Sequence, residues 1–228
     1  MEHRVLILLW LRRAALLFLL MAFSNQVYAT GAMNSNEVIQ KFLSAVEADD
    51  AALVQKALNA GIPVDSRDDR GRTALLIATY YNSIEVAKLL IAAGANVNAM
   101  DGHKDSPYLY AGAEGRLEIL KMTVASGADL NSLNRYGGTA LIPAAHHGHV
   151  EAVRYLLETK INIDHVNDLG WTALLEAVIL GDGGPVYQRI VKLLLDAGAS
   201  ARIADRDGIT PLQHAQRANQ DAIAKLLR

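Results

Sequence analysis

The feature that most constrains this chain of 228 residues is a segment that returns at a nearly fixed interval. Its five copies begin at residues 68, 101, 134, 167 and 205 and read "DDRGRTALLIA", "DGHKDSPYLYA", "NRYGGTALIPA", "NDLGWTALLEA" and "DRDGITPLQHA". The interval is 33 residues three times and then 38 residues. Such a period indicates a stack of short units, because a unit of this size buries its apolar side only against a neighbour.

Each copy carries the start signal of a first helix and the pattern of a second one. Ile190, Leu193 and Leu194 repeat the i, i+3, i+4 spacing of one helical face. An alanine recurs in every first helix, at residues 78, 111, 144, 177 and 215, and we expect its small side chain to let neighbouring units pack closely. A hydroxyl that caps a helix start contributes about 1 kcal/mol, and the residues at that position are Thr73, Ser106, Thr139, Thr172 and Thr210.

The pattern resembles the ankyrin repeat, whose units carry T-P-L-H-x-A and G-A-D-x-N signatures. Residues 210–215 read "TPLQHA", residues 127–131 read "GADLN", and a worn earlier copy begins near residue 35. The resemblance implies an all-α ankyrin-repeat solenoid of stacked helix-turn-helix units with β-turn fingers. It places the repeats at about 35–67, 68–100, 101–133, 134–166, 167–204 and 205–228.

Several places depart from the repeat pattern, and in one of them Lys104 stands where the turn glycine of its unit is expected. Pro143 lies one turn inside its expected helix, where its missing N–H should bend or loosen the helix start. Lys160 replaces a helix-ending glycine, and because a left-handed backbone there costs roughly 1 to 2 kcal/mol, we expect the loop to take another path. The insertion "GDGGPVYQ" at residues 181–188 is expected to form a loop between the two helices of its unit, either at a binding edge or as a neutral lengthening.

The first residues have the order of a secretory signal peptide. Basic residues, the last of them Arg12 and Arg13, precede the apolar stretch at 14–23, and "VYA" then supplies small residues spaced for cleavage after Ala29. We therefore expect the signal peptide at residues 1–29.

The rest of the chain then consists of a short linker at 30–34 and the ankyrin-repeat domain at 35–228, located in the periplasm or secreted. No stable membrane insertion is expected after cleavage. Two alternatives stay open: an uncleaved N-terminus that anchors the chain in the inner membrane, and a cytoplasmic protein if translation starts downstream at Met21 or Met33.

Charge and composition exclude several partners and chemistries. Lysine and arginine total 22 against 24 aspartates and glutamates, and they are scattered singly, so no basic patch exists to neutralise a run of phosphates. Nucleic acid is therefore excluded as a partner. Without cysteine the chain has no disulfide, thiol nucleophile or thiolate metal site.

The stretch "AAHHGHVEAV" at residues 144–153 holds three histidines, so metal binding and acid–base chemistry are weighed against a structural role. His149 falls in the link before the second helix, where ankyrin repeats often have histidine, and this favours a structural role. His146 and His147 point about 100° apart on a helix, which makes it hard for them to converge on one zinc ion. No H-E-x-x-H motif completes a metal set. We expect these two histidines to contact a partner, and we predict no metal, cofactor or catalytic residue.

The resemblance implies that the concave face, built from the turn tips and the exposed ends of the first helices, binds a partner protein. Tyr, Trp and Arg carry much of the binding energy in protein interfaces. Tyr80 or Trp171 could instead cover a neighbouring core, and Glu176 is either a semi-buried carboxylate facing the groove or a solvated one. Carried over position by position, the expected partner-binding residues are Arg70, Arg72, Tyr80, Tyr81, Arg135, Tyr136, His146, His147, Trp171 and Glu176.

The sequence thus predicts a monomeric, non-enzymatic scaffold that binds another protein through its concave face. One alternative is an inhibitor or immunity-type protein that neutralises an enzyme in the same compartment. Another, from a different class, is a metal- or small-ligand-binding protein or a hydrolase that uses His146, His147 and His149 together with Glu176.

Mass spectrometry of the native N-terminus tests the predicted cleavage. We expect the mature protein to begin at Thr30, because the apolar stretch and the small residues of the cleavage site end at Ala29. A native chain that begins at Met1 would support the anchored alternative, and one that begins at Met21 or Met33 would contradict export.

Overall fold

The computed structural model of the chain describes residues 35–228, and the predicted signal peptide and linker, residues 1–34, lie outside the described residues. Within the described part every regular element is a helix, and an isolated β-bridge joins Arg67 to Thr73 at the base of a turn. None of these helices has the length and apolar character that a membrane crossing requires. The expected all-α class is confirmed.

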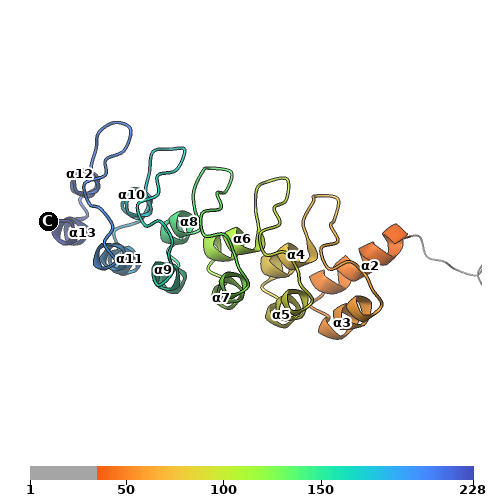
Figure 1. Cartoon of the computed structure of the whole chain (residues 1–228). Helices are drawn as coiled ribbons and strands as arrows, with labels where there is room; N and C mark the ends of the chain where they lie inside the picture. Colours follow the sequence, from red (N-terminus) through yellow and green to blue (C-terminus); the bar gives the residue numbers. More distant parts are fainter. Residues whose placement is uncertain (1–34) are drawn as a thin grey trace, which may run out of the picture. The chain divides into compact units, whose positions relative to one another are not determined.

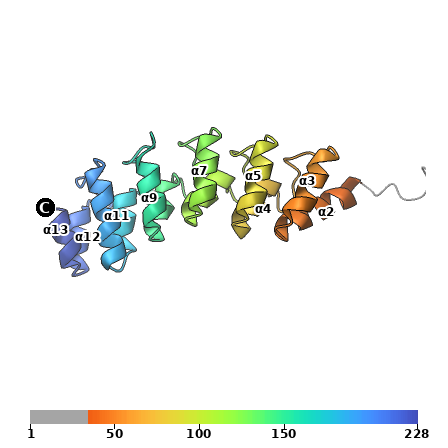
Figure 2. The same ribbon diagram turned by 90° about the horizontal axis from the view of Figure 1, so that it is seen from below.

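The helices of the unit Ile39–Arg228 alternate between two rows (Figure 1). The first helices, which from α4 on lie next to the protruding turns, are α2 (Ser35–Glu47), α4 (Ala74–Tyr81), α6 (Pro107–Ala113), α8 (Leu141–His146), α10 (Ala173–Ile179) and α12 (Pro211–Arg217). The second helices lie side by side in the other row (Figure 2) and are α3 (Ala51–Asn59), α5 (Ile84–Ala92), α7 (Leu117–Ala125), α9 (Val150–Leu157), α11 (Pro185–Asp196) and α13 (Asp221–Leu226). Along the first row, α4 contacts α6, α6 contacts α8, α8 contacts α10 and α10 contacts α12. The first helices therefore form one layer.

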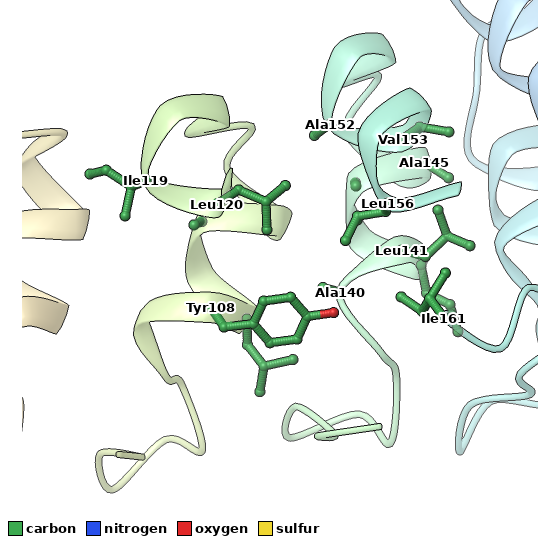
Figure 3. Close-up of a cluster of buried hydrophobic side chains, with 14 of the residues drawn as sticks. Tyr108, Ile119, Leu120, Ala140, Leu141, Ala145, Ala152, Val153, Leu156 and Ile161 are labelled. Carbon is green, nitrogen blue, oxygen red and sulfur yellow. The ribbon is translucent and has the colours of Figure 1, made fainter. Parts of the chain in front are cut away.

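Buried apolar side chains fill the space between successive helix pairs. Figure 3 shows one section of this core, in which Tyr108 of α6 lies beside Ala140, while Leu120 of α7 and Leu156 of α9 line the same interior. The core extends without a break from Phe42 to Leu227. The recurring alanines are fully buried within it, as predicted: Ala78, Ala111, Ala144, Ala177 and Ala215.

The predicted helix caps are present in four units. In each of them the hydroxyl oxygen accepts the backbone N–H three residues later, at 3.2 to 3.3 Å. These caps satisfy donors that a helix start otherwise leaves without partners. The capping residues are Thr73, Ser106, Thr172 and Thr210.

The predicted cap at Thr139 is wrong. Helix α8 begins only at Leu141, and Thr139 Oγ1 is buried without a hydrogen-bond partner among the described residues. In the capped units the residue four positions after the cap donates its N–H to the cap's carbonyl oxygen. Pro143 has no N–H to donate, and the N–H of Ile142 turns to the Thr139 carbonyl instead, at 3.2 Å. Pro143 thus loosens the helix start, as expected, and the loosened start removes the cap.

The protruding turns are β-turn fingers, each closed by one aspartate or asparagine. The side-chain Oδ1 of this residue accepts the backbone N–H groups two and four positions later, at 2.8 to 3.0 Å. In the finger where glycine is missing, Lys104 takes the left-handed conformation with a φ of 61°. The closing residues are Asp68, Asp101, Asn134, Asn167 and Asp205.

The loop after α9 avoids a left-handed backbone at Lys160, as expected. Lys160 is absent from the positive-φ residues of the described chain. The side chain of Thr159 closes this turn in place of a glycine backbone. Its hydroxyl donates to the Leu156 carbonyl at 2.6 Å and accepts the Ile161 N–H at 3.2 Å.

The insertion at 181–188 is only partly a loop, contrary to the prediction. Its second half is the first turn of α11, which begins at Pro185 with Gly184 as the preceding cap residue. Proline suits the first helical position because the N–H there has no helical partner. Tyr187 in this turn donates its hydroxyl to the His146 carbonyl at 2.8 Å. The insertion therefore braces the neighbouring unit.

Separate replacement of Thr172 and Thr139 by valine distinguishes the two helix starts, because valine keeps the shape of threonine and lacks the hydroxyl. Thr172→Val loses the cap and should lower the free energy of unfolding by about 1 kcal/mol. Thr139→Val removes a hydroxyl without a partner and should leave that free energy unchanged or raise it. Urea denaturation followed by circular dichroism measures both. Equal losses would contradict the missing cap at Thr139.

Candidate functional site

A hollow of about 370 Å³ opens between the first helices α6, α8 and α10 and the fingers that begin at Asn134 and Asn167. Five of the predicted partner-binding residues line it: Arg135, Tyr136, His146, His147 and Glu176. The other five lie outside the lining: Arg70, Arg72, Tyr80, Tyr81 and Trp171. The fold therefore brings only half of the predicted partner-binding residues together in this hollow.

Glu176 places a buried carboxylate in the hollow. Its residue exposure is 6%, and Asn167 Nδ2 donates to its Oε1 at 2.8 Å. The second oxygen, Oε2, lies 3.5 Å from His146 Nδ1 and accepts no hydrogen bond from the described residues. Burial raises the pKa of Glu176, partly offset by the Asn167 hydrogen bond, and burial together with His147 lowers the pKa of His146. Burial thus disfavours the charged form of both partners.

A second carboxylate, Asp105, stands on the opposite side of the hollow, beside a pair of stacked tyrosines. The rings of Tyr80 and Tyr110 lie 3.8 Å apart at 26°, and the Tyr80 hydroxyl donates to Asp105 Oδ2 at 3.2 Å. Burial raises the pKa of Asp105 even though Arg135, whose Nη1 is 3.8 Å from Oδ2, acts in the other direction. The fold thus buries the carboxyl groups of both Glu176 and Asp105, and this burial costs free energy when they are charged.

The rim of the hollow carries an exposed cation and an exposed ring. The guanidinium of Arg135 lies 5.5 Å from the ring centroid of Tyr136, and the arginine side chain is 49% exposed. Tyr136 is 56% exposed. Both side chains are accessible to a partner.

Arg72, in contrast, is already held by the chain's own residues. Its Nε lies 2.7 Å from Asp68 and its Nη2 lies 3.3 Å from Glu47, and its side chain is only 13% exposed. The guanidinium also sits 5.5 Å from the ring centroid of Tyr80. This geometry makes Arg72 a support for Tyr80. Of the others outside the hollow, Tyr81 and Arg70 are exposed, and Trp171 is half-buried.

The three histidines stay near one another without forming a ligand set. The ring centroids of His146 and His147 are 4.7 Å apart, and those of His147 and His149 are 5.9 Å apart. Nδ1 of His147 lies 2.7 Å from the Ala113 carbonyl, which occupies that nitrogen. His149 precedes α9, and burial lowers its pKa. In residues 35–228 no group of three or more His, Cys, Asp or Glu side chains is arranged to hold a metal ion.

Sequence reasoning missed Tyr110 and Asn167. Tyr110 stands immediately before the buried Ala111, as Glu176 stands immediately before Ala177, so an alignment of the units on the recurring alanines identifies Tyr110. Asn167 closes its finger with Oδ1 and uses its Nδ2 to hold Glu176. No motif signals this second role.

Burial of Glu176 predicts an unusual dependence of stability on pH. A carboxyl whose pKa is higher in the folded chain than in the unfolded chain binds its proton more tightly when folded, so stability falls as the pH rises from its ordinary value of 4.5 through the raised pKa. Glu176→Gln keeps an oxygen for Asn167 and should raise the free energy of unfolding at neutral pH, with the gain disappearing below pH 4.5. Urea unfolding at a series of pH values measures the difference.

Glu85→Gln, on the exposed side of α5, controls for the loss of one negative charge. A Glu176→Gln chain that is no more stable than the unsubstituted chain at neutral pH would contradict the inferred cost of burying this carboxylate.

Comparison with known proteins agrees with this architecture. Two overlapping matches to the family model for ankyrin repeats (3 copies) span residues 42–132 and 108–200. The crystal structure of an ankyrin repeat domain from Acinetobacter baumannii AYE is 57% identical, with a TM-score of 0.80, over 82% of this chain and 95% of that one. The ankyrin repeat protein EF0377 is 46% identical, with a TM-score of 0.79 and the same coverage of 82% and 95%.

A shorter similarity extends to a curated protein. The ankyrin repeat protein YahD of Escherichia coli (strain K12) is 48% identical over 52 residues, which are 23% of this chain. The matched segment spans only about a quarter of that relative's length, 26%. With the family model covering most of the described residues, the chain belongs to the ankyrin-repeat family.

Proposed function

We propose that this chain is a non-enzymatic binding protein that holds another protein against the face formed by its fingers and first helices. Ankyrin repeats generally act as protein–protein interaction modules. The observation that carries the choice of face is a set of large side chains that surround the hollow and remain open to solvent. Tyr136, Leu169 and Leu180 line it with exposures of 56%, 49% and 42%.

This arrangement has the character of a protein-binding surface. Exposed apolar and aromatic groups around a polar centre supply contact area, while the buried centre supplies specificity. The chain's own packing leaves these three side chains uncovered, and they are the exposed large hydrophobic residues of the described chain that line the hollow. A partner that covers them would remove apolar surface from water, which favours association.

An inhibitor or immunity-type role would use the same face with an enzyme as the partner. The order of basic, apolar and small residues before Thr30 supports a place of action outside the cytoplasm. A partner from the periplasm or the secreted fraction is therefore the one to seek.

The binding face is tested by the triple substitution Tyr136→Ala, Leu169→Ala and Leu180→Ala. Chemical crosslinking in a native extract, followed by identification of the crosslinked protein, measures capture. Because a few large side chains dominate most interfaces, we expect the triple variant to lose at least about tenfold in crosslinked partner.

The matched control replaces three exposed apolar residues on second helices, Leu53, Ile84 and Leu226, with alanine. The control should capture the partner normally, and both variants should keep the helical circular dichroism of the unsubstituted chain. Normal capture by the groove variant, or an equal loss in the control, would contradict the proposed face.

A further inference from the structure

We propose that the hollow receives the side chain of an arginine that the partner projects into the groove. The proposal rests on the proposed function, because it names the chemistry of the group that the binding face would take. Three features of the hollow lead to it: its charge, a carboxylate oxygen without a hydrogen bond from the described residues, and aromatic rings on its wall and rim.

The lining of the hollow is acidic. It contains three carboxylates, from Asp105, Glu114 and Glu176, against a single guanidinium, from Arg135. Arg135 lies near Asp105 and over the ring of Tyr136. Within the described chain Glu114 has no ion pair, and the basic groups near Glu176 are the imidazoles of His146 and His147. An anionic group of a partner would be repelled here, and a cationic group would be attracted.

The buried carboxylate lacks part of its hydrogen bonding. Glu176 is 6% exposed, its Oε1 accepts a hydrogen bond from Asn167, and its Oε2 faces His146 Nδ1 at 3.5 Å without a hydrogen bond from the described residues. A carboxylate oxygen that has only this longer contact can still accept a charged donor, and such a charge-assisted hydrogen bond is one of the stronger ones in proteins. An incoming N–H group with a positive charge fits this oxygen.

The aromatic groups favour arginine over lysine. Tyr110 lines the wall and Tyr136 the rim, and a planar guanidinium stacks on such rings in a way that a compact ammonium does not. The chain itself makes this contact twice, with Arg72 over Tyr80 and Arg135 over Tyr136, each at 5.5 Å.

The size of the hollow is consistent with one inserted side chain. Its 370 Å³ lies near the lower end of about 300 to 1,000 Å³ for ligand pockets. No metal-binding cluster competes for it among residues 35–228.

The test is a nuclear magnetic resonance titration of the full chain with acetyl-Gly-Arg-Gly-amide. The matched probe replaces arginine with citrulline, which has the same shape without the charge. We expect saturable shifts of the backbone amides of Ala113, Gly138 and Leu180, which line the hollow. Because hydrogen bonds to charged groups are among the stronger ones, the citrulline probe should bind at least about tenfold more weakly.

Two substitutions connect this binding to the acidic lining. Glu176→Gln and Glu114→Gln should each weaken binding of the arginine probe, the former by about tenfold. The side chain of Glu114 forms no hydrogen bond or ion pair within the described chain, and its backbone N–H bond to the Tyr110 carbonyl survives the substitution, so we expect the variant to fold normally. Glu151→Gln, on the exposed side of α9, is the control and should bind the probe normally.

Equal binding of the arginine and citrulline probes would overturn the proposal. So would shifts confined to residues outside the hollow, normal binding by both lining variants, or the absence of saturable shifts at millimolar probe. The crosslinking test with the triple variant of Tyr136, Leu169 and Leu180 is independent of this titration. Failure of the arginine site is therefore distinguishable from failure of the binding face.

Discussion

The close approach of successive first helices is the constraint on which the rest of this structure depends. The recurring alanines of the first helices are fully buried, and Gly112 of α6 comes so near to Ala140 that an added Cβ would lie 2.8 Å from the alanine Cβ. A larger side chain at either place would push neighbouring units apart. Since each helix pair is covered only by its neighbours, this spacing is transmitted along the whole stack.

Fixed spacing also determines where the site forms. The residue before each recurring alanine occupies an equivalent place in every unit, and this place is filled in turn by Ile77, Tyr110, Pro143, Glu176 and His214. Tyr110, Pro143 and Glu176 line the hollow, whereas Ile77 is buried and His214 contacts Asp205. The repeated positions build the layer, and the varied position beside them gives one stretch of it a particular chemistry.

The sequence predicted the repeated parts of the fold well, because caps, alanines and glycines act within a single unit. It failed where two signals compete or where distant residues meet. Thr139 lost its cap to Pro143, four positions away, and the insertion joined α11 because Pro185 can open a helix as well as end a loop. The ion pair between Arg72 and Glu47 joins two units across 25 positions of sequence, and the pattern within a single unit does not predict such a contact. The repeat alignment identifies a site residue only where that residue occupies a position shared by all units. The sequence therefore predicted part of the candidate site and missed the rest.

The buried carboxylate of Glu176 gives the proposed binding of an arginine a physical source of selectivity. The free energy needed to remove this group from water is supplied by the packing of α8, α10 and their neighbours when the chain folds. A partner's guanidinium would therefore meet an acceptor that is already desolvated and held in place by Asn167, and it would not have to order a flexible side chain. A neutral group of the same size would gain the contact area but would offer Oε2 no charge-assisted hydrogen bond. Discrimination would thus come from a cost already contained in the fold, which is a different source from the apolar area that Tyr136, Leu169 and Leu180 offer at the rim.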